Sequence, residues 1–568
     1  MIRLDKHRAS MQGEGASVAV GAAESKPKSS SAAAGRSVAI VGAGPGGLGT
    51  AMLLAAKNID VTVYEAAPTV GGRTTRLSLA SASGDQYHFD TGPTFFLMPY
   101  VLDEIFAATG RRLGDYVKLT QLDPMYRLVM GRAGQSPLTI DCTQNIPEMC
   151  RRIEQQIDPR DGKPFAKFIS DNRQKLTAFE PVLRKPFRTV ADLFDPKLIA
   201  ALPYLGPTRS VYQDLSARFH SEYTKLITSF QSKYLGMSPM NCPSLFTILP
   251  FIEYEYGIWH PQGGCNRLMT AMADVCREMG VKIKLGQPVE RITFSGRRAT
   301  GVVVDSMVQP HEHVVLNADA SWAIKNLIPA DLRRGPMAWS DKKLDGMGYS
   351  CSTFMLYAGL SDKVDLPHHT IYISEKYKDN LADISSRGVL SHDPSMYFCN
   401  ATVTDDSIAP AGHSAIYGLL PAPNVRDGKI NWPAETAGLR KAMLGKLADL
   451  CGRDVEREIT TERVFTPETW QGRNINFGAT FNLAHNLTQM LMLRPQHELA
   501  GVENVWLAGG GTHPGSGLPV IFLSCQIAAG RIAARLGCAS PSPAVQPRPA
   551  FSPTQAQNDA RPRVAATA

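Results

Sequence analysis

Three glycines and two charged residues are the first part of the chain whose spacing could carry chemistry. Gly42, Gly44 and Gly47 form the pattern G-x-G-x-x-G, and Glu65 and Arg73 follow them. Glycines in this pattern permit a tight turn, close backbone approach to a pyrophosphate, and packing of a helix on a strand. An acidic residue roughly 20 positions later suits a ribose hydroxyl. These residues predict a dinucleotide cradle; the alternative is a glycine-rich turn with a structural role.

The elements that must position this cradle flank the glycines. Residues 38–41 form a short apolar run typical of a buried parallel strand, residues 48–56 have the apolar pattern of a helix, and residues 61–64 predict a second strand. The helix would begin at the cradle, where its free N–H groups and partial positive charge attract phosphate. Strand, glycines, helix, strand and acid in one βαβ length favour the cradle, with Ala43 inside it.

A second glycine cluster follows the acidic residue. Gly71 and Gly72 precede Arg73, whose guanidinium suits a further phosphate contact, and residues 88–96 form another turn around Gly92. This ordered set resembles the flavoprotein family of amine oxidases and carotenoid desaturases. The resemblance implies that the dinucleotide is FAD and that these glycines and Arg73 hold it. The alternative for Arg73 is an ordinary surface arginine.

Residues 259–304 extend the resemblance. They begin with WHPQGG, and their apolar spacing predicts an amphipathic helix over 268–279 and a hairpin around 295–297. The resemblance implies that Val289 contacts the adenine.

The sequence GTHPGSGLP at 511–519 is similar to the signature turn of bacterial-type carotenoid desaturases, the phytoene and diapophytoene desaturase group. The resemblance implies that this turn runs beneath the flavin ring and that the following helix points its N-terminus at the ring. It assigns flavin contacts to Gly510, Pro519 and Val520. His513 in this turn is either a general base or, as its glycine-rich setting favours, structural.

The fold class predicted is α/β. A Rossmann-like FAD-binding domain is interrupted twice by a second α+β substrate domain that contains a helical, membrane-facing part. The FAD-binding segments are 37–130, 258–327 and 472–537, the substrate-domain segments are 131–257 and 328–471, and disordered tails are expected at 1–36 and 538–568.

The segment 151–233 carries fifteen Lys and Arg against nine Asp and Glu, mixed with apolar residues. One interpretation is an amphipathic surface that docks on a membrane, with Phe194, Leu198 and Leu205 entering the interface. The other is a helical core with a solvated basic face. The resemblance favours docking, because the family takes its substrates from lipid.

Catalytic residues are poorly marked, as expected where a cofactor carries the difficult step. The resemblance implies an Arg/Asp cluster near the flavin, and Arg188 and Asp192 are its nearest counterparts, although their spacing departs from the family pattern and a second arginine is missing. The alternative is surface charge at a helix start. Glu253 and Glu255 could form a carboxylate pair on one face of a strand.

The segment 469–498 aligns with the family stretch on the substrate side of the flavin. Its residues suited to a polyene tunnel are Phe477, Phe481, Met490, Met492 and Arg494. The alternative is ordinary core.

Composition excludes several classes. The net charge of +8 is too mild to argue for nucleic acid, and the ten cysteines show no metal-site spacing, so no metal is expected. The N-terminus lacks the apolar stretch of a signal peptide, and no run of about 18 apolar residues predicts a spanning helix. We expect a cytoplasmic protein attached peripherally to a membrane.

The function predicted is FAD-dependent desaturation of a phytoene- or diapophytoene-like precursor, with reduced flavin reoxidised by oxygen or a quinone. Other carotenoid reactions on the same scaffold stay open: oxidation of a terminal methyl, isomerisation or saturation. Amine oxidation and a non-enzymatic prenyl-binding escort are further alternatives; the intact cradle argues against the escort.

Overall fold

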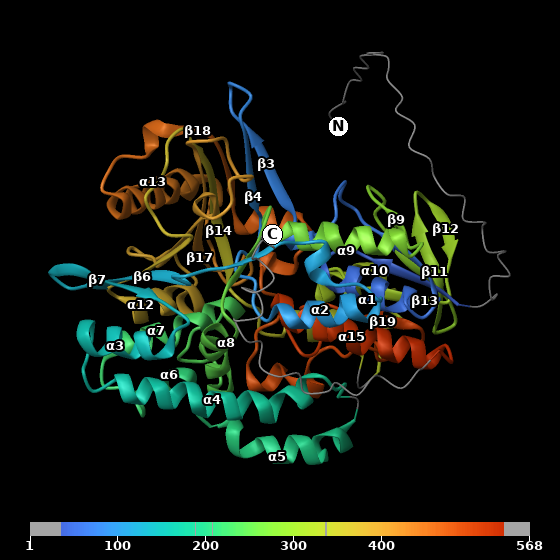
Figure 1. Cartoon of the computed structure of the whole chain (residues 1–568). Helices are drawn as coiled ribbons and strands as arrows, with labels where there is room; N and C mark the ends of the chain where they lie inside the picture. The colour runs from blue at the N-terminus through green and yellow to red at the C-terminus, as the bar shows by residue number, and fades with distance from the viewer. Residues whose placement is uncertain (1–35, 188, 207, 336–337, 539–568) are drawn as a thin grey trace, which may run out of the picture. The chain divides into compact units, whose positions relative to one another are not determined.

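The computed structural model describes residues 36–187, 189–206, 208–335 and 338–538 (Figure 1). The expected tails lie outside these residues except for Arg36 and Cys538. The described chain from Arg36 onward forms one unit, built on two large sheets.

A five-stranded parallel sheet has the order β19-β13-β1-β2-β9. Its strands are β1 (Ser37–Val41), β2 (Asp60–Tyr64), β9 (Lys282–Lys284), β13 (His313–Leu316) and β19 (Val505–Leu507). They come from all three segments predicted for FAD binding, so the discontinuous Rossmann-like domain is confirmed.

The two faces of this sheet are covered differently. Along β1, Val38 and Ile40 join the core formed with the helices α1 (Pro45–Ala55), α2 (Pro99–Ala108), α9 (Asn266–Glu278) and α15 (Leu518–Arg535). Ala39 and Val41 face the opposite core, which includes α10 (Ala320–Leu327) and the small sheet of β10 (Arg291–Ser295), β11 (Arg298–Val304) and β12 (Met307–Pro310). This alternation follows from the two-residue period of a strand.

Helix α15 is long and apolar enough to cross a membrane by length and composition. More than half of it is buried, and Phe522, Cys525 and Ile532 lie in the core shared with α1. It is therefore a core helix of the sheet.

A seven-stranded mixed sheet has the order β18-β14-β17-β16-β15-β6-β7. Its strands are β6 (Tyr126–Arg132), β7 (Gln135–Cys142), β14 (Ser352–Leu360), β15 (His369–Ile373), β16 (Met396–Asn400), β17 (Ser414–Ala422) and β18 (Ile459–Phe465). One face packs on α13 (Trp432–Cys451) through Phe354, Leu356 and Phe398. Because β6 belongs to this sheet, residues 126–130 at the end of the first predicted FAD-binding segment lie in the seven-stranded sheet.

The part of the chain that follows β7, residues 143–257, is largely helical. It contains α3 (Ile146–Gln156), α4 (Gly162–Leu183), α5 (Pro196–Leu205), α6 (Val211–Ser216), α7 (Glu222–Ile227) and α8 (Ile248–Tyr256). In Figure 1, α5 lies at the lower edge, beneath α4. The remaining elements are the strand pairs β3 (Arg76–Ala80) with β4 (Gln86–Asp90) and β5 (Leu119–Gln121) with β8 (Trp259–Pro261), and the short helices α11 (Asp341–Asp345), α12 (Tyr377–Ala382) and α14 (Pro467–Gly472).

The prediction of a strand at Glu253 and Glu255 is wrong, because both lie on α8. On a helix, residues i and i+2 do not share a face. Glu253 is fully buried, whereas Glu255 forms an ion pair of 2.6 Å with Arg173. They are not a carboxylate pair.

Candidate active site

A cavity of about 910 Å³ has walls from both large sheets. At one end it is lined by the glycine turn after β1, the end of β2 and the start of α15; elsewhere it is lined by aromatic and aliphatic side chains of the seven-stranded sheet. A dinucleotide cradle and an apolar chamber therefore open into one space.

The glycine turn has no room for side chains. Gly42 has φ +102°, which L-residues rarely adopt, and a Cβ on Gly47 would lie 2.1 Å from the carbonyl oxygen of Gly42. A Cβ on Gly44 would lie 3.1 Å from Asn317 Nδ2 and narrow the cavity that Gly44 lines. Helix α1 begins just after Gly44 without a side-chain cap. The turn thus presents backbone N–H groups to an anion.

Glu65 directly follows β2 and faces the glycine turn. It is 9% exposed and lines the cavity; its Oε2 accepts a hydrogen bond from Ala43 N–H (2.7 Å) and its Oε1 one from Ala67 N–H (2.8 Å). The carboxylate therefore stays fixed at the position predicted for ribose binding. Ala43 anchors it and is not itself a cavity-lining residue.

Arg73 lines the cavity, and two of its guanidinium nitrogens differ in their hydrogen bonding. Its Nη2 donates to Asp319 Oδ2 (3.1 Å) and Asn482 Oδ1 (3.0 Å), whereas Nε is shut off from solvent and has no hydrogen-bond partner among the residues that the structure describes. Burial lowers the pKa of Arg73 and raises that of Asp319, so both charges are poorly solvated. An acceptor on a bound cofactor would satisfy Nε. Arg73 is not an ordinary surface arginine.

Other predicted cofactor residues surround the same end of the cavity. Those that line it are Gly42, Gly44, Glu65, Gly72, Arg73, Gly92, Val289, Gly510 and Pro519. Gly47 does not line the cavity; it packs against the carbonyl group of Gly42 inside the turn. Val520 lies in the first turn of α15 between the cavity-lining Pro519 and Ile521. Gly517 and Leu518 at the start of α15 also line this end of the cavity, while the orientation of the helix toward a flavin ring stays a prediction.

The turn before α15 is held by Arg494. This side chain is fully buried and donates to the carbonyl oxygens of four residues: Leu483, Ala484, Gly510 and Thr512. Burial lowers its pKa to about 9. The prediction that Arg494 lines a tunnel is therefore wrong. Its side chain holds the turn before α15 in place.

His513 has a structural setting. It is buried, its ring packs edge-on against Phe187 with centroids 5.3 Å apart, and burial lowers its pKa to about 4. It does not line the cavity.

Of the predicted catalytic pair, the structure describes Asp192. Arg188 lies outside the described residues. Asp192 does not line the cavity; its Oδ2 accepts from Thr189 N–H (2.8 Å), capping the short helix Val190–Phe194. An acid three residues after a threonine forms this capping box whatever its distance from the active site. The expectation of a catalytic Asp192 is corrected accordingly.

The apolar wall differs from the predicted one. Of the tunnel residues predicted at 469–498, Phe481 lines the cavity, whereas Phe477, Met490 and Met492 do not. The aromatic side chains that do line it include Phe95, Phe230, Tyr234, Tyr397 and Tyr417. They come from separate parts of the chain, and no local motif marks them.

Comparison with known proteins places the chain among flavoenzymes. Residues 45–533 match the family of flavin-containing amine oxidoreductases. The chain is 38% identical over 496 residues to a 4,4'-diapophytoene desaturase of Methylomonas sp, covering 87% of this chain and 94% of that protein. It is 38% identical over 532 residues to the all-trans-zeta-carotene desaturase of Myxococcus xanthus, covering 92% and 98%.

Solved structures share the fold at low identity. An oxidoreductase from Methanosarcina mazei matches with a TM-score of 0.56 at 15% identity, covering 86% of this chain and 99% of that one. Putrescine oxidase bound to putrescine matches at 0.54 and 14% identity, covering 88% and 99%. A Rab GDI from Plasmodium falciparum matches at 0.51 and 11% identity, covering 88% and 98%.

Proposed function

Since the chain belongs to the carotenoid desaturases within the family of flavin-containing amine oxidoreductases, we propose that it desaturates an apolar isoprenoid such as phytoene or diapophytoene. Its cofactor is FAD. When bound, FAD accepts hydride from a saturated carbon. The glycine turn, Glu65 and the unpartnered Nε of Arg73 fit its pyrophosphate and ribose.

The observation that carries this proposal is the continuity of the cavity. The cradle end and the aromatic chamber form one space, so an apolar chain can lie beside the cofactor without a polar anchor. Burial among apolar side chains supplies the affinity, and the walls supply the orientation and exclude water. A substrate with no polar handle needs such a site.

The intact cradle also argues against the escort alternative. The Rab GDI shares the fold, but likeness at 11% identity speaks for fold alone. Oxidation of a terminal methyl, isomerisation and saturation of a carotenoid use the same cradle and remain rivals to desaturation.

The test is the product spectrum. The chain is expressed in cells that accumulate phytoene and, separately, in cells that accumulate diapophytoene. Desaturation shifts the absorption of the extracted polyene to longer wavelength and adds conjugated double bonds. An unchanged polyene in both hosts, with the flavin bound, would refute desaturation; a product altered only in its methyl groups or geometry would support a rival reaction.

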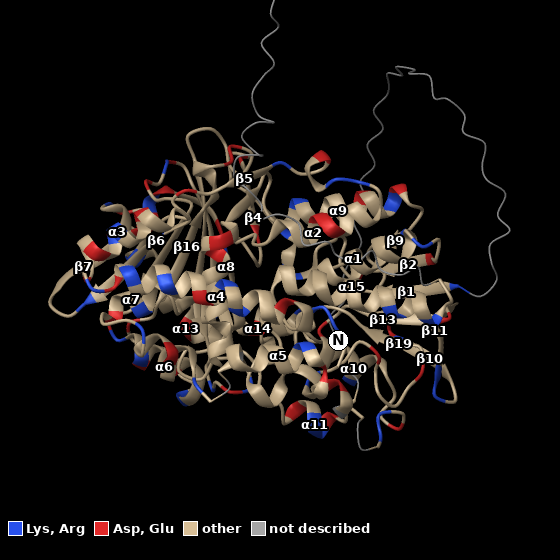
Figure 2. Cartoon of the chain, turned by 60° about the horizontal axis from the view of Figure 1, so that its bottom comes forward, with Lys and Arg blue, Asp and Glu red and all other residues tan. Residues whose placement is uncertain are grey.

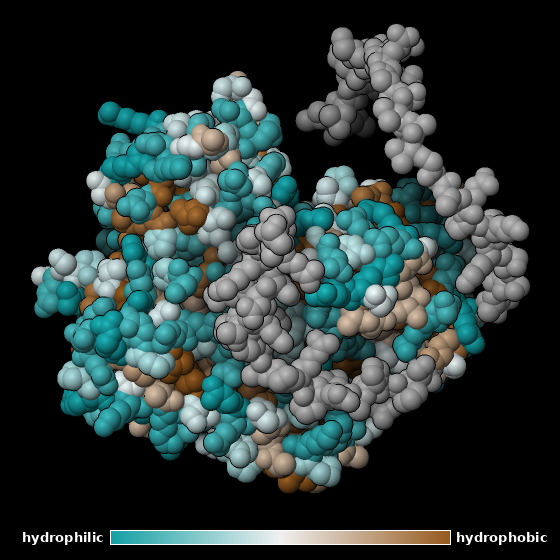
Figure 3. Space-filling model, in the orientation of Figure 1, coloured by the Kyte–Doolittle hydropathy of each residue, from teal (hydrophilic) through white to brown (hydrophobic). Residues whose placement is uncertain are grey.

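We propose in addition that the protein attaches peripherally to an anionic cytoplasmic leaflet through α5 and the residues before it. Phe194, Ile199 and Leu202 are 71%, 49% and 49% exposed. Figure 3 shows apolar atoms at the lower edge, where Figure 1 draws α5, and Figure 2 draws α5 almost wholly uncharged. Leu198 is buried, so its predicted entry into the interface is wrong; the side chain of Leu205 lies outside the described part.

The electron acceptor we propose is oxygen or a membrane quinone. A membrane-bound enzyme would meet a quinone in the phase that holds its substrate. Anaerobic turnover restored by an added quinone supports the quinone, and turnover that only oxygen restores supports oxygen.

A further inference from the structure

A hydrogen-bonded chain of three residues begins at the cavity surface and ends behind it. Thr94 and Tyr397 both line the cavity, and their hydroxyl oxygens are 2.7 Å apart. The hydroxyl of Tyr397 lies 2.8 Å from Nδ1 of His369 on the neighbouring strand β15. A path for a proton therefore leads from the cavity surface to a buried imidazole.

His369 is in a state to accept a proton. It is fully buried, and the ring of Phe95 stacks on it with centroids 4.1 Å apart. Burial holds its pKa well below the usual value, so the imidazole is neutral at neutral pH. Within the described part of the chain, its Nε2 has no hydrogen-bond partner.

Further titratable groups lie behind His369. The ring centroids of His368 and His369 are 4.4 Å apart, and those of His260 and His368 are 4.7 Å apart. His260 Nε2 is 2.9 Å from Asp405 Oδ2. Burial would raise the pKa of Asp405, but hydrogen bonds from His260, Ser407 and Gly263 N–H outweigh it and hold this pKa far below its usual range. A buried carboxylate thus lies at the far end of the histidine cluster.

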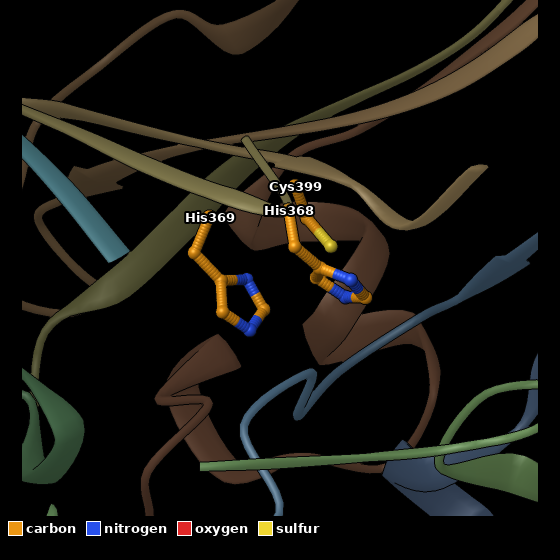
Figure 4. A group of neighbouring side chains, drawn as sticks. All are labelled: His368, His369 and Cys399. Carbon is orange, nitrogen blue, oxygen red and sulfur yellow. The ribbon is translucent and has the colours of Figure 1, made fainter. Parts of the chain in front are cut away.

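The same cluster invites a second interpretation. One ring nitrogen each of His368 and His369 and the sulphur of Cys399 lie within 4.8 Å of one another, as candidate metal ligands (Figure 4). However, Nδ1 of each histidine is already bonded, to Thr404 and Tyr397. Burial raises the pKa of the Cys399 thiol to about 12, so a metal bound there would have to displace the thiol proton. Proton transfer, by contrast, needs only the hydrogen bonds from Thr94 to Tyr397 and from Tyr397 to His369, which the structure contains.

We propose that Tyr397 takes the proton released in desaturation and passes its own to His369. This rests on the proposed function. Desaturation removes one hydrogen as hydride, which FAD accepts, and in the same step the adjacent carbon loses a proton, whose C–H electron pair becomes the new π bond. That proton bonds to Tyr397 Oη, while the Tyr397 hydroxyl proton moves to His369 Nδ1. No other oxidant is required.

The relay fixes the directions of the hydrogen bonds. Thr94 donates to Tyr397, Tyr397 donates to Nδ1 of His369, and Nε2 of His369 carries the ring proton. A metal on Nε2 would need the opposite tautomer, with the proton on Nδ1. The tautomer therefore separates the two interpretations.

The kinetic test compares Tyr397→Phe with Tyr417→Phe in the FAD-loaded enzyme. Both rings line the cavity, but the Tyr417 hydroxyl donates to the carbonyl oxygen of Gly92 (3.0 Å), which is not a base. Flavin bleaching is followed anaerobically in one turnover with liposomes loaded with phytoene or diapophytoene. We expect Tyr397→Phe to lower the rate about 100-fold or more, and Tyr417→Phe less than about 10-fold. Equal losses would overturn the proposal.

His369→Asn keeps an acceptor close to the position of Nδ1 but cannot take the proton. We expect it to match Tyr397→Phe in rate with unchanged flavin content, and to remove the solvent deuterium effect on bleaching that the wild type shows. A full wild-type rate in His369→Asn would overturn the relay. A wild type that never bleaches with either polyene would count against the proposed function instead.

Two measurements need no turnover. Histidine-selective ¹⁵N labelling of the FAD-loaded enzyme should give His369 a hydrogen-free, acceptor-type Nδ1 that His369→Asn removes. Metal analysis of the same preparation should give well below one zinc per chain. A protonated Nδ1, or zinc at unit stoichiometry lost in Cys399→Ser, would overturn the relay in favour of a metal site.

Discussion

Glu65 Oε2 lies 2.7 Å from the backbone nitrogen of Ala43, so the acid at the end of β2 is bonded to the glycine turn at the end of β1. One side chain thereby serves two purposes. It braces the turn that holds pyrophosphate, and it keeps a carboxylate at the cavity wall for a ribose hydroxyl.

Gly44→Val should abolish FAD binding. A Cβ at Gly44 would lie 3.1 Å from Asn317 Nδ2, and the valine methyl groups would occupy cavity space beside the start of α1. The purified variant should be colourless when flavin absorbance is measured per chain. Gly438→Val is the control, since Gly438 lies exposed on α13 with no atom close to an added Cβ. A yellow Gly44→Val protein would contradict the cradle.

Glu65→Gln should weaken FAD binding without abolishing it. The amide oxygen can still accept from Ala43, but the amide NH₂ group would face Ala67 N–H, and one charged hydrogen bond to the ribose is lost. Such a bond is worth roughly 1.5–3 kcal/mol, or about 10- to 150-fold in Kd. Fluorescence titration of the FAD-depleted protein measures it. A loss as complete as that of Gly44→Val would mean that Glu65 acts mainly by bracing the turn.

The cradle could be predicted because its parts are local. Glycines, helix start and acid lie within one βαβ unit, where sequence spacing fixes spatial order. The partners of Arg73 could not be predicted, since Asp319 and Asn482 lie 246 and 409 residues away. The same holds for the aromatic wall: Tyr397 and Tyr417 meet through strand pairing that no motif encodes.

The failure at Glu253 has a different cause. The stretch FIEYEY is rich in aromatic and β-branched residues, which favour a strand by propensity. Packing of α8 against α4 overrides this preference and buries Phe251, Tyr254 and Glu253 together. Tertiary contacts decided the element, and with it the environment of the acid.

Glu253→Gln should stabilise the protein at alkaline pH. Burial raises the pKa of Glu253 to about 7, above its ordinary 4.5, so the folded state binds a proton more tightly than the unfolded state. Stability therefore falls as pH rises from about 4.5 through 7, by about 3 kcal/mol in all. Glutamine can keep the bonds from Tyr126 and Gln231, and it titrates nowhere.

The melting temperature measured between pH 5 and pH 8 tests this. Glu253→Gln should exceed the wild type at pH 8 and approach it at pH 5. Glu255→Gln is the control, because Glu255 pairs with Arg173 at the surface and should leave the pH slope intact. A wild-type slope retained in Glu253→Gln would assign the pH dependence to another group.

Removing the exposed apolar residues at α5 should detach the protein from membranes. The triple variant Phe194→Ser, Ile199→Ser, Leu202→Ser loses apolar side chains that are each about half exposed or more. In the wild type, salt should weaken co-sedimentation with anionic liposomes only in part, because screening acts on charge and leaves apolar burial intact. The triple variant should bind only weakly at low salt and dissociate fully from the liposomes in high salt.

The control is Met307→Ser with Val308→Ser, which removes equally exposed apolar residues from β12 and should bind as the wild type does. Binding that both variants lose alike would show a general effect of surface hydrophobicity, and binding that the triple variant keeps would place the membrane contact elsewhere on the molecule.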